Sequence, residues 1–227
     1  MSVDDNFYLI YNNVELYILN KEGGAAMRTQ AKAKERVRNY GEVFTAEREV
    51  NAMLDLVKQE VKNIDSTFME PACGDGNFLV EILRRKIDSV FKLVGQNEAD
   101  CEYWATRAIS TIYGVDIQKD NVLRARKRLF SDFFTRFINR YKHQPSSICQ
   151  NSVRFILSQN IQCGNTLTHE RSAGEPLMIT KWFFDDNNGL TISLYDYEEM
   201  VETGCHCEPS HILPRIPYLL LPAIVQQ

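Results

Sequence analysis

The chain has 227 residues, of which 44% are apolar and 25% are charged, and its formal net charge is −4. This composition suits a globular protein with one large domain, or with one domain and a small appendage, and it excludes a molecule that is basic overall. The six cysteines are scattered, no segment resembles a signal peptide, and the longest apolar run, 218–225, is short and contains Pro222. We therefore expect a cytoplasmic protein without a membrane-spanning segment.

Residues 1–26 form a distinct amino-terminal region. They combine a short apolar stretch from Phe7 to Leu19 with a Gly/Ala link from Lys21 to Ala26. Neither helical nor strand periodicity is sustained there, so we predict an extension or an added strand pair ahead of a main domain that begins near Met27. Removing residues 1–26 is accordingly expected to leave the fold and ligand binding intact.

The segment from Tyr40 to Thr45 is predicted to be a turn that leads into an amphipathic helix. Thr45 can cap this helix, and Glu47 and Glu49 favour its first turn through the helix dipole. Apolar residues then recur at helical spacing as far as residue 64, namely Val50, Met53, Leu54, Val57, Val61 and Ile64.

The stretch from Phe68 to Leu79 reads F-M-E-P-A-C-G-D-G-N-F-L and predicts a strand, a tight turn and the start of a helix. Gly74 and Gly76 allow positive φ angles and a close approach of the backbone to a ligand. Glu70 places a carboxylate at the carboxyl end of the strand, where ligands bind in open α/β sheets. No G-K-[S/T] follows and the third glycine of the dinucleotide fingerprint is missing. The acid suits a ligand with amine and hydroxyl groups, and a purely structural turn is the alternative.

Two further strands are predicted, and each ends in a polar residue. An apolar run from Thr111 to Ile117 ends in Asp116, and the stretch 160–167 ends in a Gly-Asn turn at Asn165. We expect these strand ends to lie beside Glu70 at one edge of a sheet. In dinucleotide folds an acid beyond the glycines binds ribose hydroxyls, and an ordinary strand-end acid is the other reading of Asp116.

Helices are predicted between these strands at 77–93, 102–110, 119–143 and 153–158. The first is expected to pair Glu81 with Arg85 on its exposed side and to bury five apolar residues, Phe78, Leu79, Ile82, Leu83 and Ile87. Asp120 is expected to cap the long helix, with an apolar stripe of Leu123, Phe130, Phe133, Phe134, Phe137, Ile138 and Tyr141. Segment 119–143 carries eight Lys or Arg and two Asp, whereas segment 170–208 carries nine acids and two bases. This asymmetry permits a DNA-binding face on the basic helix, and a solvated helix face is the alternative.

The carboxy-terminal part, 169–227, differs in character. Apolar runs at 181–184 and 190–195 flank Asn188-Gly189, which predicts a β-hairpin, and a proline-punctuated tail follows. Cys205, His206, Cys207 and His211 match no structural zinc pattern, so no metal site is assigned.

Four motifs together resemble the S-adenosylmethionine pocket of N6-adenine DNA methyltransferases, especially type I-like modification subunits. They are G-E-V-F-T (41–45), E-P-A-C-G-D-G-N-F-L (70–79), Y-G-V-D-I (113–117) and C-G-N-T-L (163–167). The glycine-loop motif is the most specific, and the motif order is that of the family. The resemblance covers about Arg36 to Leu167, and Ala46 stands where the family usually has proline.

The resemblance implies a Rossmann-like class I methyltransferase domain at 27–168, with helices on both faces of its sheet, and a small carboxy-terminal β-hairpin extension. It implies that Gly74 and Gly76 approach the methionine moiety and that Asp116 holds the ribose. It also implies that Asn165 replaces the usual acid at the adenine amine and that Thr45 closes over the cofactor. The full implied cofactor-binding set is Thr45, Glu70, Pro71, Ala72, Gly74, Gly76, Phe78, Asp116, Ile117 and Asn165.

One motif of that family is missing. The methyltransferases carry [N/D/S]-P-P-[Y/F/W] after the third strand, where it holds the amine and stacks on the flipped base. None of the seven prolines here is adjacent to another or follows Asn, Asp or Ser. The catalytic residues therefore stay unassigned, and the chain has no room for a sizeable target-recognition domain.

Three functions remain open from the sequence. The first is a DNA adenine methyltransferase of restriction–modification or phage type, using a partner protein or an unrecognised catalytic segment. The second is a cofactor-binding subunit or regulator that does not transfer methyl groups by itself. The third, a methyltransferase for a small molecule or a protein, would not need the missing motif, but the amino-terminal motif argues against it.

Overall fold

The computed structural model describes residues 7–9, 30–31, 43–171, 174–185, 187–204 and 206–224. Its centre is a five-stranded sheet in the order β1-β4-β5-β6-β7. The strands are β1 (Phe7–Leu9), β4 (Thr67–Glu70), β5 (Ile112–Asp116), β6 (Ile161–Asn165) and β7 (Glu170–Arg171). The first four run parallel and β7 runs antiparallel to β6. The predicted α/β fold is thus confirmed as a mixed α/β architecture with a largely parallel sheet.

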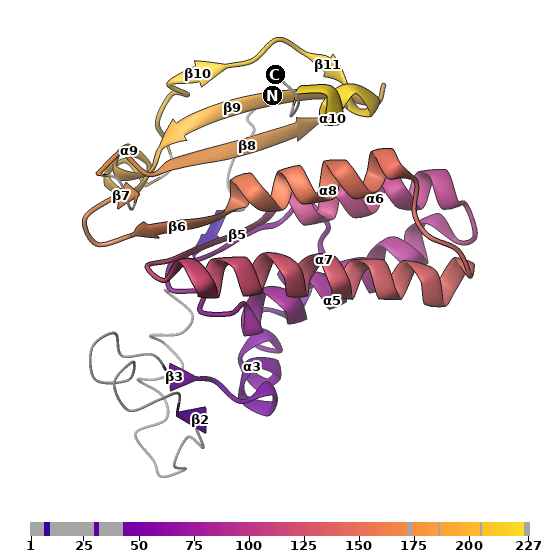
Figure 1. The fold of residues 1–227 in the computed structure, drawn as a ribbon, viewed down its shortest axis with the longest axis horizontal. Helices are drawn as coiled ribbons and strands as arrows, with labels where there is room; N and C mark the ends of the chain where they lie inside the picture. The colour runs from indigo at the N-terminus through magenta and orange to yellow at the C-terminus, as the bar shows by residue number, and fades with distance from the viewer. Residues whose placement is uncertain are drawn as a thin grey trace.

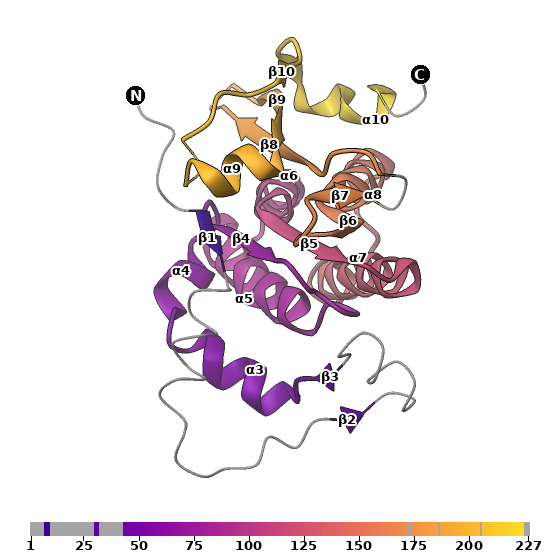
Figure 2. The same ribbon diagram turned by 90° about the vertical axis from the view of Figure 1, so that its left-hand side faces the viewer.

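The crossovers from β4 to β5 and from β5 to β6 each consist of two helices. α5 (Asn77–Val94) and α6 (Glu98–Ser110) connect β4 to β5, and α7 (Lys119–Tyr141) and α8 (Ser147–Asn160) connect β5 to β6. Figure 2 shows α5 and α7 on one face of the sheet and α6 and α8 on the other. The sheet is therefore covered on both faces, which explains why every residue of β5 is buried.

Helix α5 follows its predicted pattern closely. The five apolar residues expected to face the core are all buried, namely Phe78, Leu79, Ile82, Leu83 and Ile87. Burying one such side chain contributes about 1.5–3 kcal/mol. On the outer side, Arg85 Nε lies 3.0 Å from Glu81 Oε1, which confirms the predicted i,i+4 ion pair.

Helix α7 differs from its prediction at the amino-terminal end. Gln118, not Asp120, is the N-cap residue, and Asp120 instead pairs with Arg124 at 2.8 Å. Leu123, expected on the buried stripe, is 54% exposed, whereas Phe133 and Phe137 are buried.

None of the described helices is both long and apolar enough to cross a membrane.

Three other helix boundaries depend on capping groups that the sequence analysis did not use. The expected helix up to residue 64 is two helices, α3 (Glu47–Leu54) and α4 (Lys58–Lys62). Ala46, not Thr45, is the N-cap of α3, and its N–H donates to Glu49 Oε2. α6 and α8 begin earlier than predicted because Asn97 and Ser146 accept hydrogen bonds from backbone N–H groups of their first turns.

A second, antiparallel sheet forms most of the carboxy-terminal part. It contains β8 (Met178–Phe184), β9 (Gly189–Asp196), β10 (His211–Ile212) and β11 (Ile216–Pro217), and its neighbours are α9 (Tyr197–Glu202), a 3₁₀ turn (Tyr218–Leu220) and α10 (Leu221–Ile224). The predicted β8–β9 hairpin is confirmed. It lies over α6 and α8 (Figure 1), and the buried Trp182 indole donates to Asn160 Oδ1 at 2.8 Å.

Lys86 is a fully buried cation on α5. Its ammonium donates to the backbone carbonyls of Asn63, Ile64 and Ser66 at 2.8, 3.0 and 2.6 Å. These carbonyls belong to the turn that leads into β4, so Lys86 fixes the approach of the chain to this strand. Burial lowers the pKa of Lys86 to about 7.

The main sheet extends beyond both predicted domain boundaries. β1 comes from the region set apart as residues 1–26 and pairs with β4 along Phe7–Leu9, while β7 follows the boundary at 168. A two-stranded ribbon, β2 (Gln30–Ala31) with β3 (Val43–Phe44), precedes Thr45. Because β1 covers one edge of β4, this pairing replaces the expectation that residues 1–26 can be removed without loss.

Deletion of residues 1–9, which removes β1, is expected to destabilise the protein relative to deletion of residues 1–6. Without β1, the backbone groups of β4 lose their partners, and each lost hydrogen bond costs about 0.5–1.5 kcal/mol. Urea unfolding followed by circular dichroism measures the difference. Equal free energies of unfolding for the two deletions would show that the β1–β4 pairing contributes nothing.

Candidate functional site

The polar ends of three neighbouring parallel strands lie at one edge of the main sheet. Glu70 ends β4, Asp116 ends β5 and Asn165 ends β6. β5 pairs with both of its neighbours, with Glu70 opposite Gly114 and Asp116 opposite Cys163. The predicted alignment of the three strand ends is therefore confirmed. In open α/β sheets this edge is where ligands bind.

The glycine turn after β4 is held against the end of β5. Cys73 N donates to Val115 O and Gly74 N donates to Asp116 Oδ2, each at 2.9 Å. Gly76 has φ +87°, and a Cβ atom at this position would lie 3.1 Å from Ala125 Cβ of α7. Glycine is required at residue 76 because the chain turns left-handed while it touches α7.

The Asp116 carboxylate, in a side chain that is only 9% exposed, accepts three hydrogen bonds from the protein. Its Oδ2 atom accepts from Gly74 N, and its Oδ1 atom accepts from Gln118 N at 2.8 Å and Asn121 Nδ2 at 3.1 Å. A carboxylate oxygen has two acceptor positions, so Oδ2 can accept one more hydrogen bond. Asp116 is thus a structural junction that still has capacity for a ligand hydroxyl.

Arg128 of α7 clamps the glycine turn from the other side. Its Nη1 donates to Asp75 O and its Nη2 to Asn77 Oδ1, both at 2.8 Å. Asn77 Nδ2 in turn donates to Thr45 O at 3.3 Å, which brings the predicted Thr45 segment to the turn. The sequence analysis missed Arg128 because it is one of eight bases in segment 119–143, which was read only for its net charge.

The loop after β6 is joined to the loop after β4 by a second contact that the sequence analysis missed. Thr166 Oγ1 donates to Pro71 O at 3.1 Å. This bond passes across the end of β5, since β5 lies between the two strands. The residues that follow Glu70 and Asn165 are therefore held at a fixed separation.

Glu70 is the acid with the most unusual environment at this edge. Burial raises the pKa of its carboxyl well above the usual range, and the nearby carboxylates of Asp116 and Asp75 raise it further. Its Oε2 atom is buried without a hydrogen-bond partner among the described residues. A cationic ligand group beside Glu70 would relieve both the repulsion and the unsatisfied acceptor.

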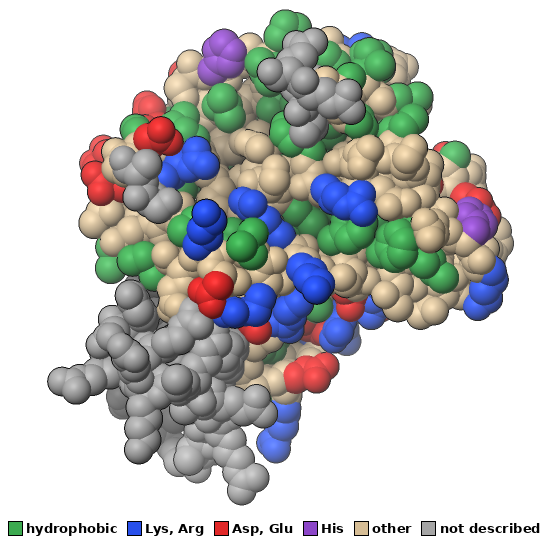
Figure 3. Space-filling view, viewed as in Figure 1, with side chains coloured by type: hydrophobic (Ala, Val, Ile, Leu, Met, Phe, Trp, Pro, Cys, Tyr) green, Lys and Arg blue, Asp and Glu red, His purple; other side chains and the backbone are tan. Residues whose placement is uncertain are grey.

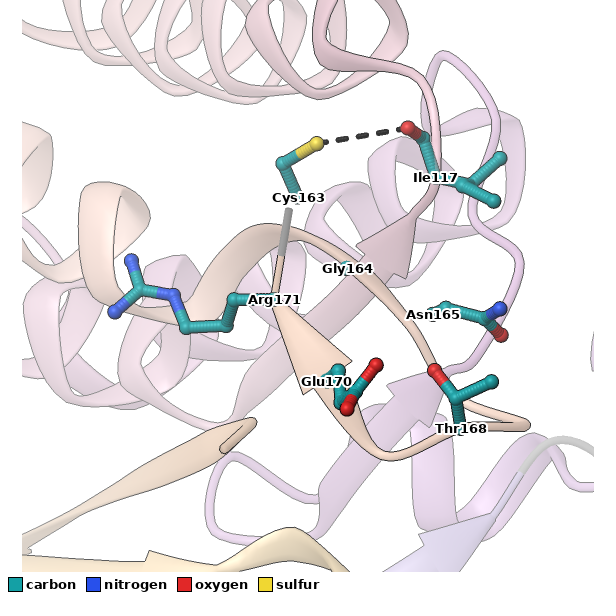
Figure 4. A pocket seen from close by; sticks show the side chains of 7 residues that line it. All are labelled: Ile117, Cys163, Gly164, Asn165, Thr168, Glu170 and Arg171. Carbon is teal, nitrogen blue, oxygen red and sulfur yellow. Dashed lines mark hydrogen bonds between the residues drawn. The ribbon is translucent and has the colours of Figure 1, made fainter. Parts of the chain in front are cut away.

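A cavity of about 270 Å³ lies beside the end of β6 (Figure 4). It is lined by Ile117, Cys163, Gly164, Asn165, Thr168, Glu170 and Arg171. Of the ten residues implied by the resemblance, Ile117 and Asn165 line it. Glu70, the glycine turn and Asp116 lie on the β4–β5 side of this edge, outside the cavity lining. The cavity is slightly smaller than typical ligand pockets of about 300–1,000 Å³, so it suits one part of a ligand.

Phe78, which the resemblance places in the cofactor-binding set, has a buried side chain. Its side chain is only 7% exposed and packs in the hydrophobic core. Ala72, by contrast, is exposed beside the glycine turn, and Pro71 is half-buried. Phe78 is the second residue of an amphipathic helix, so the apolar stripe of α5 accounts for its position.

The positive charge of α7 is partly used inside the protein. Arg126 donates to Ser158 O and Ile161 O, and Arg136 pairs with Asp88 and Asp132. The side chains of four bases on α7 and α8 are exposed, namely Lys119, Arg124, Lys127 and Arg154. Figure 3 shows basic side chains gathered across this face of the molecule.

The cysteine and histidine residues described near the carboxyl end form no cluster that could hold a metal ion. Within the part of the chain that the structure describes, no group of three or more His, Cys, Asp or Glu side chains could hold a metal ion. Cys205, one member of the set considered from sequence, lies outside the described residues.

Replacing Glu70 by Gln is expected to raise the free energy of unfolding at pH 8 and to change it little at pH 4. Since the folded pKa of Glu70 is raised, its contribution to stability is full below the unfolded pKa, about 4.3, and is lost as pH rises through the folded pKa. Glutamine stays neutral and avoids this loss. Urea titrations at both pH values test the prediction, with the exposed Glu208→Gln as the control. A destabilised Glu70→Gln protein at pH 8 would contradict it.

Comparison with protein-family models, with curated proteins and with solved structures found no match to this chain. Arguments about its function therefore depend on the residues and contacts described above, and on the motif resemblance.

Proposed function

We propose that this chain is a Rossmann-like, S-adenosylmethionine-binding protein of the DNA adenine-N6 methyltransferase type. The observation that carries the proposal is the meeting of the glycine turn with Asp116 at the edge where β4, β5 and β6 end. Three of the four motifs that suggested the family contribute strand ends to this edge. The fourth reaches it through the hydrogen bond from Asn77 to Thr45 O.

The chemical groups at this edge fit the parts of S-adenosylmethionine. The ligand carries an ammonium and a sulfonium charge, and Glu70 has a buried Oε2 atom that lacks a hydrogen-bond partner among the described residues and that a cation would stabilise. Its ribose has two hydroxyl donors, and Asp116 Oδ2 keeps an acceptor position. The cavity beside Asn165 offers space for a purine ring.

The DNA part of the proposal rests on the resemblance and on the exposed bases of α7 and α8. Lys119, Lys127 and Arg154 have no acidic partner among the described residues. Such side chains can neutralise backbone phosphates, and the affinity would then fall steeply with salt concentration. The net charge of −4 limits this face to a local contact.

The second function, a cofactor-binding subunit that needs a partner protein for methyl transfer, is favoured by the contacts of Asp185 and Trp182, a polar and an aromatic residue that follow β6 in the chain. Asp185 accepts from Asn187 N, Gly189 N and the Arg215 guanidinium, so it closes the β8–β9 turn. The Trp182 indole is buried and bonded to Asn160. The Asp185 carboxylate is engaged in these hydrogen bonds and the Trp182 indole in packing, so neither is free to hold a flipped base.

We expect Asp116→Ala to weaken the binding of S-adenosylmethionine by about 1.5–3 kcal/mol. The change removes a charged acceptor and also releases Gly74 N, so the glycine turn loses its anchor. Isothermal titration calorimetry measures the affinity, and thermal melting verifies that the variant is folded. The control is Asp120→Ala, which removes an exposed acid in the first turn of α7. If the folded Asp116→Ala variant binds S-adenosylmethionine with unchanged affinity, Asp116 has only a structural role.

The isolated chain is expected to methylate DNA adenine poorly or not at all. The adenine amine is a weak nucleophile because its lone pair is delocalised into the ring, and the missing motif is what positions it. An error of ~1 Å in that position can cost ~100-fold in rate. Transfer of labelled methyl groups to unmethylated DNA of mixed sequence tests this. Robust turnover that is abolished by folded variants at Asp185 or Trp182 would contradict it.

A further inference from the structure

The cavity beside β6 has a wall that the sequence did not predict. β7 pairs antiparallel with β6, and Glu170 lies directly opposite Asn165 in the register. Opposite residues of an antiparallel pair extend from the same face, with Cβ atoms roughly 4.5–5.5 Å apart. Glu170 and Asn165 both line the cavity (Figure 4). A carboxylate and an amide are therefore presented together to one ligand.

Glycine at residue 164 permits this arrangement. A Cβ atom there would lie 2.9 Å from Glu170 O, which is closer than real side chains approach a backbone oxygen. Any larger residue at 164 would push β7 away from β6. The glycine of the C-G-N-T-L motif thus brings Glu170 to the cavity.

The orientation of the Asn165 amide is fixed by the turn that follows. Leu167 N–H donates to Asn165 Oδ1 at 2.9 Å, and an N–H donor requires the oxygen at that position. The Nδ2 group is thereby left as the free end of the amide, and it has no hydrogen-bond acceptor within the described part of the chain. Asn165 can donate to a ligand from Nδ2, but its oxygen is already engaged.

Glu170 supplies the acceptor that Asn165 lacks. Its side chain is exposed to the cavity, and no hydrogen bond or ion pair holds its carboxylate among the described residues. Ile117, 54% exposed, adds an apolar surface on which an aromatic ring can lie. Within this lining, Asn165 offers a donor, Glu170 an anionic acceptor and Ile117 an apolar wall.

We propose that Asn165 and Glu170 together select a 6-aminopurine, with Asn165 Nδ2 donating to a ring nitrogen and Glu170 accepting from the exocyclic amine. This inference rests on the proposed function, and it reverses the role that the resemblance implied for Asn165. A 6-oxopurine carries a carbonyl oxygen where adenine carries the amine, and this oxygen would face the Glu170 carboxylate. Discrimination between the two bases follows from that repulsion and from the lost hydrogen bond.

The test compares two probes, S-adenosylhomocysteine and S-inosylhomocysteine, by calorimetry on the full chain. The wild-type protein is expected to bind the adenosyl probe at least about 10-fold more tightly than the inosyl probe. Glu170→Gln is expected to lose most of this preference, because a neutral amide can donate to the inosine carbonyl. The control is Glu202→Gln, which changes an exposed acid on α9 outside the cavity.

A second variant separates the two roles possible for Asn165. Asn165→Asp keeps the acceptor for Leu167 N–H but places an oxygen where Nδ2 stood. Weaker binding of the adenosyl probe supports the proposal, whereas tighter binding would mean that residue 165 faces the amine and would overturn it. If the folded Glu170→Gln variant still prefers the adenosyl probe over the inosyl probe, this inference is overturned while the proposed function stands. Failure of the wild-type protein to bind either probe would remove the proposed function and this inference with it.

Discussion

The hydrogen bond from Gly74 N to Asp116 Oδ2 fixes the geometry on which the rest of the site depends. Two strands can pair in register and still leave their following loops free to diverge. Here the carboxylate at the end of β5 holds the turn after β4, while its other oxygen holds the start of α7 through Gln118 and Asn121. One buried charge, compensated by three donors, therefore positions a turn, a strand end and a helix.

The other contacts at this edge extend the same organisation. Arg128 approaches the glycine turn from α7, and Thr166 ties the loop after β6 to Pro71. Against this rigid frame, Glu70 is an exception, since it is an acid placed near two other acids with one oxygen unsatisfied. Such an arrangement costs stability, and sites that bind cationic ligands commonly accept that cost.

β4 and β5 could be predicted because a continuous apolar run ends in a polar residue, and helix α5 because its apolar residues recur on one face. β7 and β1 could not be predicted, because strands of two or three residues are too short to show an alternation of apolar and polar residues. Such strands form only where the edge of another strand is available for pairing. The role of Arg128 was hidden for a different reason: helical periodicity gives the face of a side chain but not its partner. Asn165 was identified as a site residue, but its amide orientation depends on a turn hydrogen bond that has no sequence signature. Leu123, at the edge of the sheet where the strands end, is exposed, which hydrophobicity alone does not reveal.

The buried ammonium of Lys86 couples folding to proton release. Its folded pKa is about 7, against about 10.4 for an unfolded lysine, so above neutral pH the chain gives up a proton as it folds. Between these values the unfolded state holds more protons, and the contribution of Lys86 to stability rises with pH by up to about 1.4 kcal/mol per unit. Glu70, at the other end of β4, acts in the opposite sense, since its raised pKa makes stability fall as pH rises above the unfolded value of about 4.3. The two ends of β4 therefore respond oppositely to pH, because a rise in pH favours the burial of Lys86 and disfavours that of Glu70.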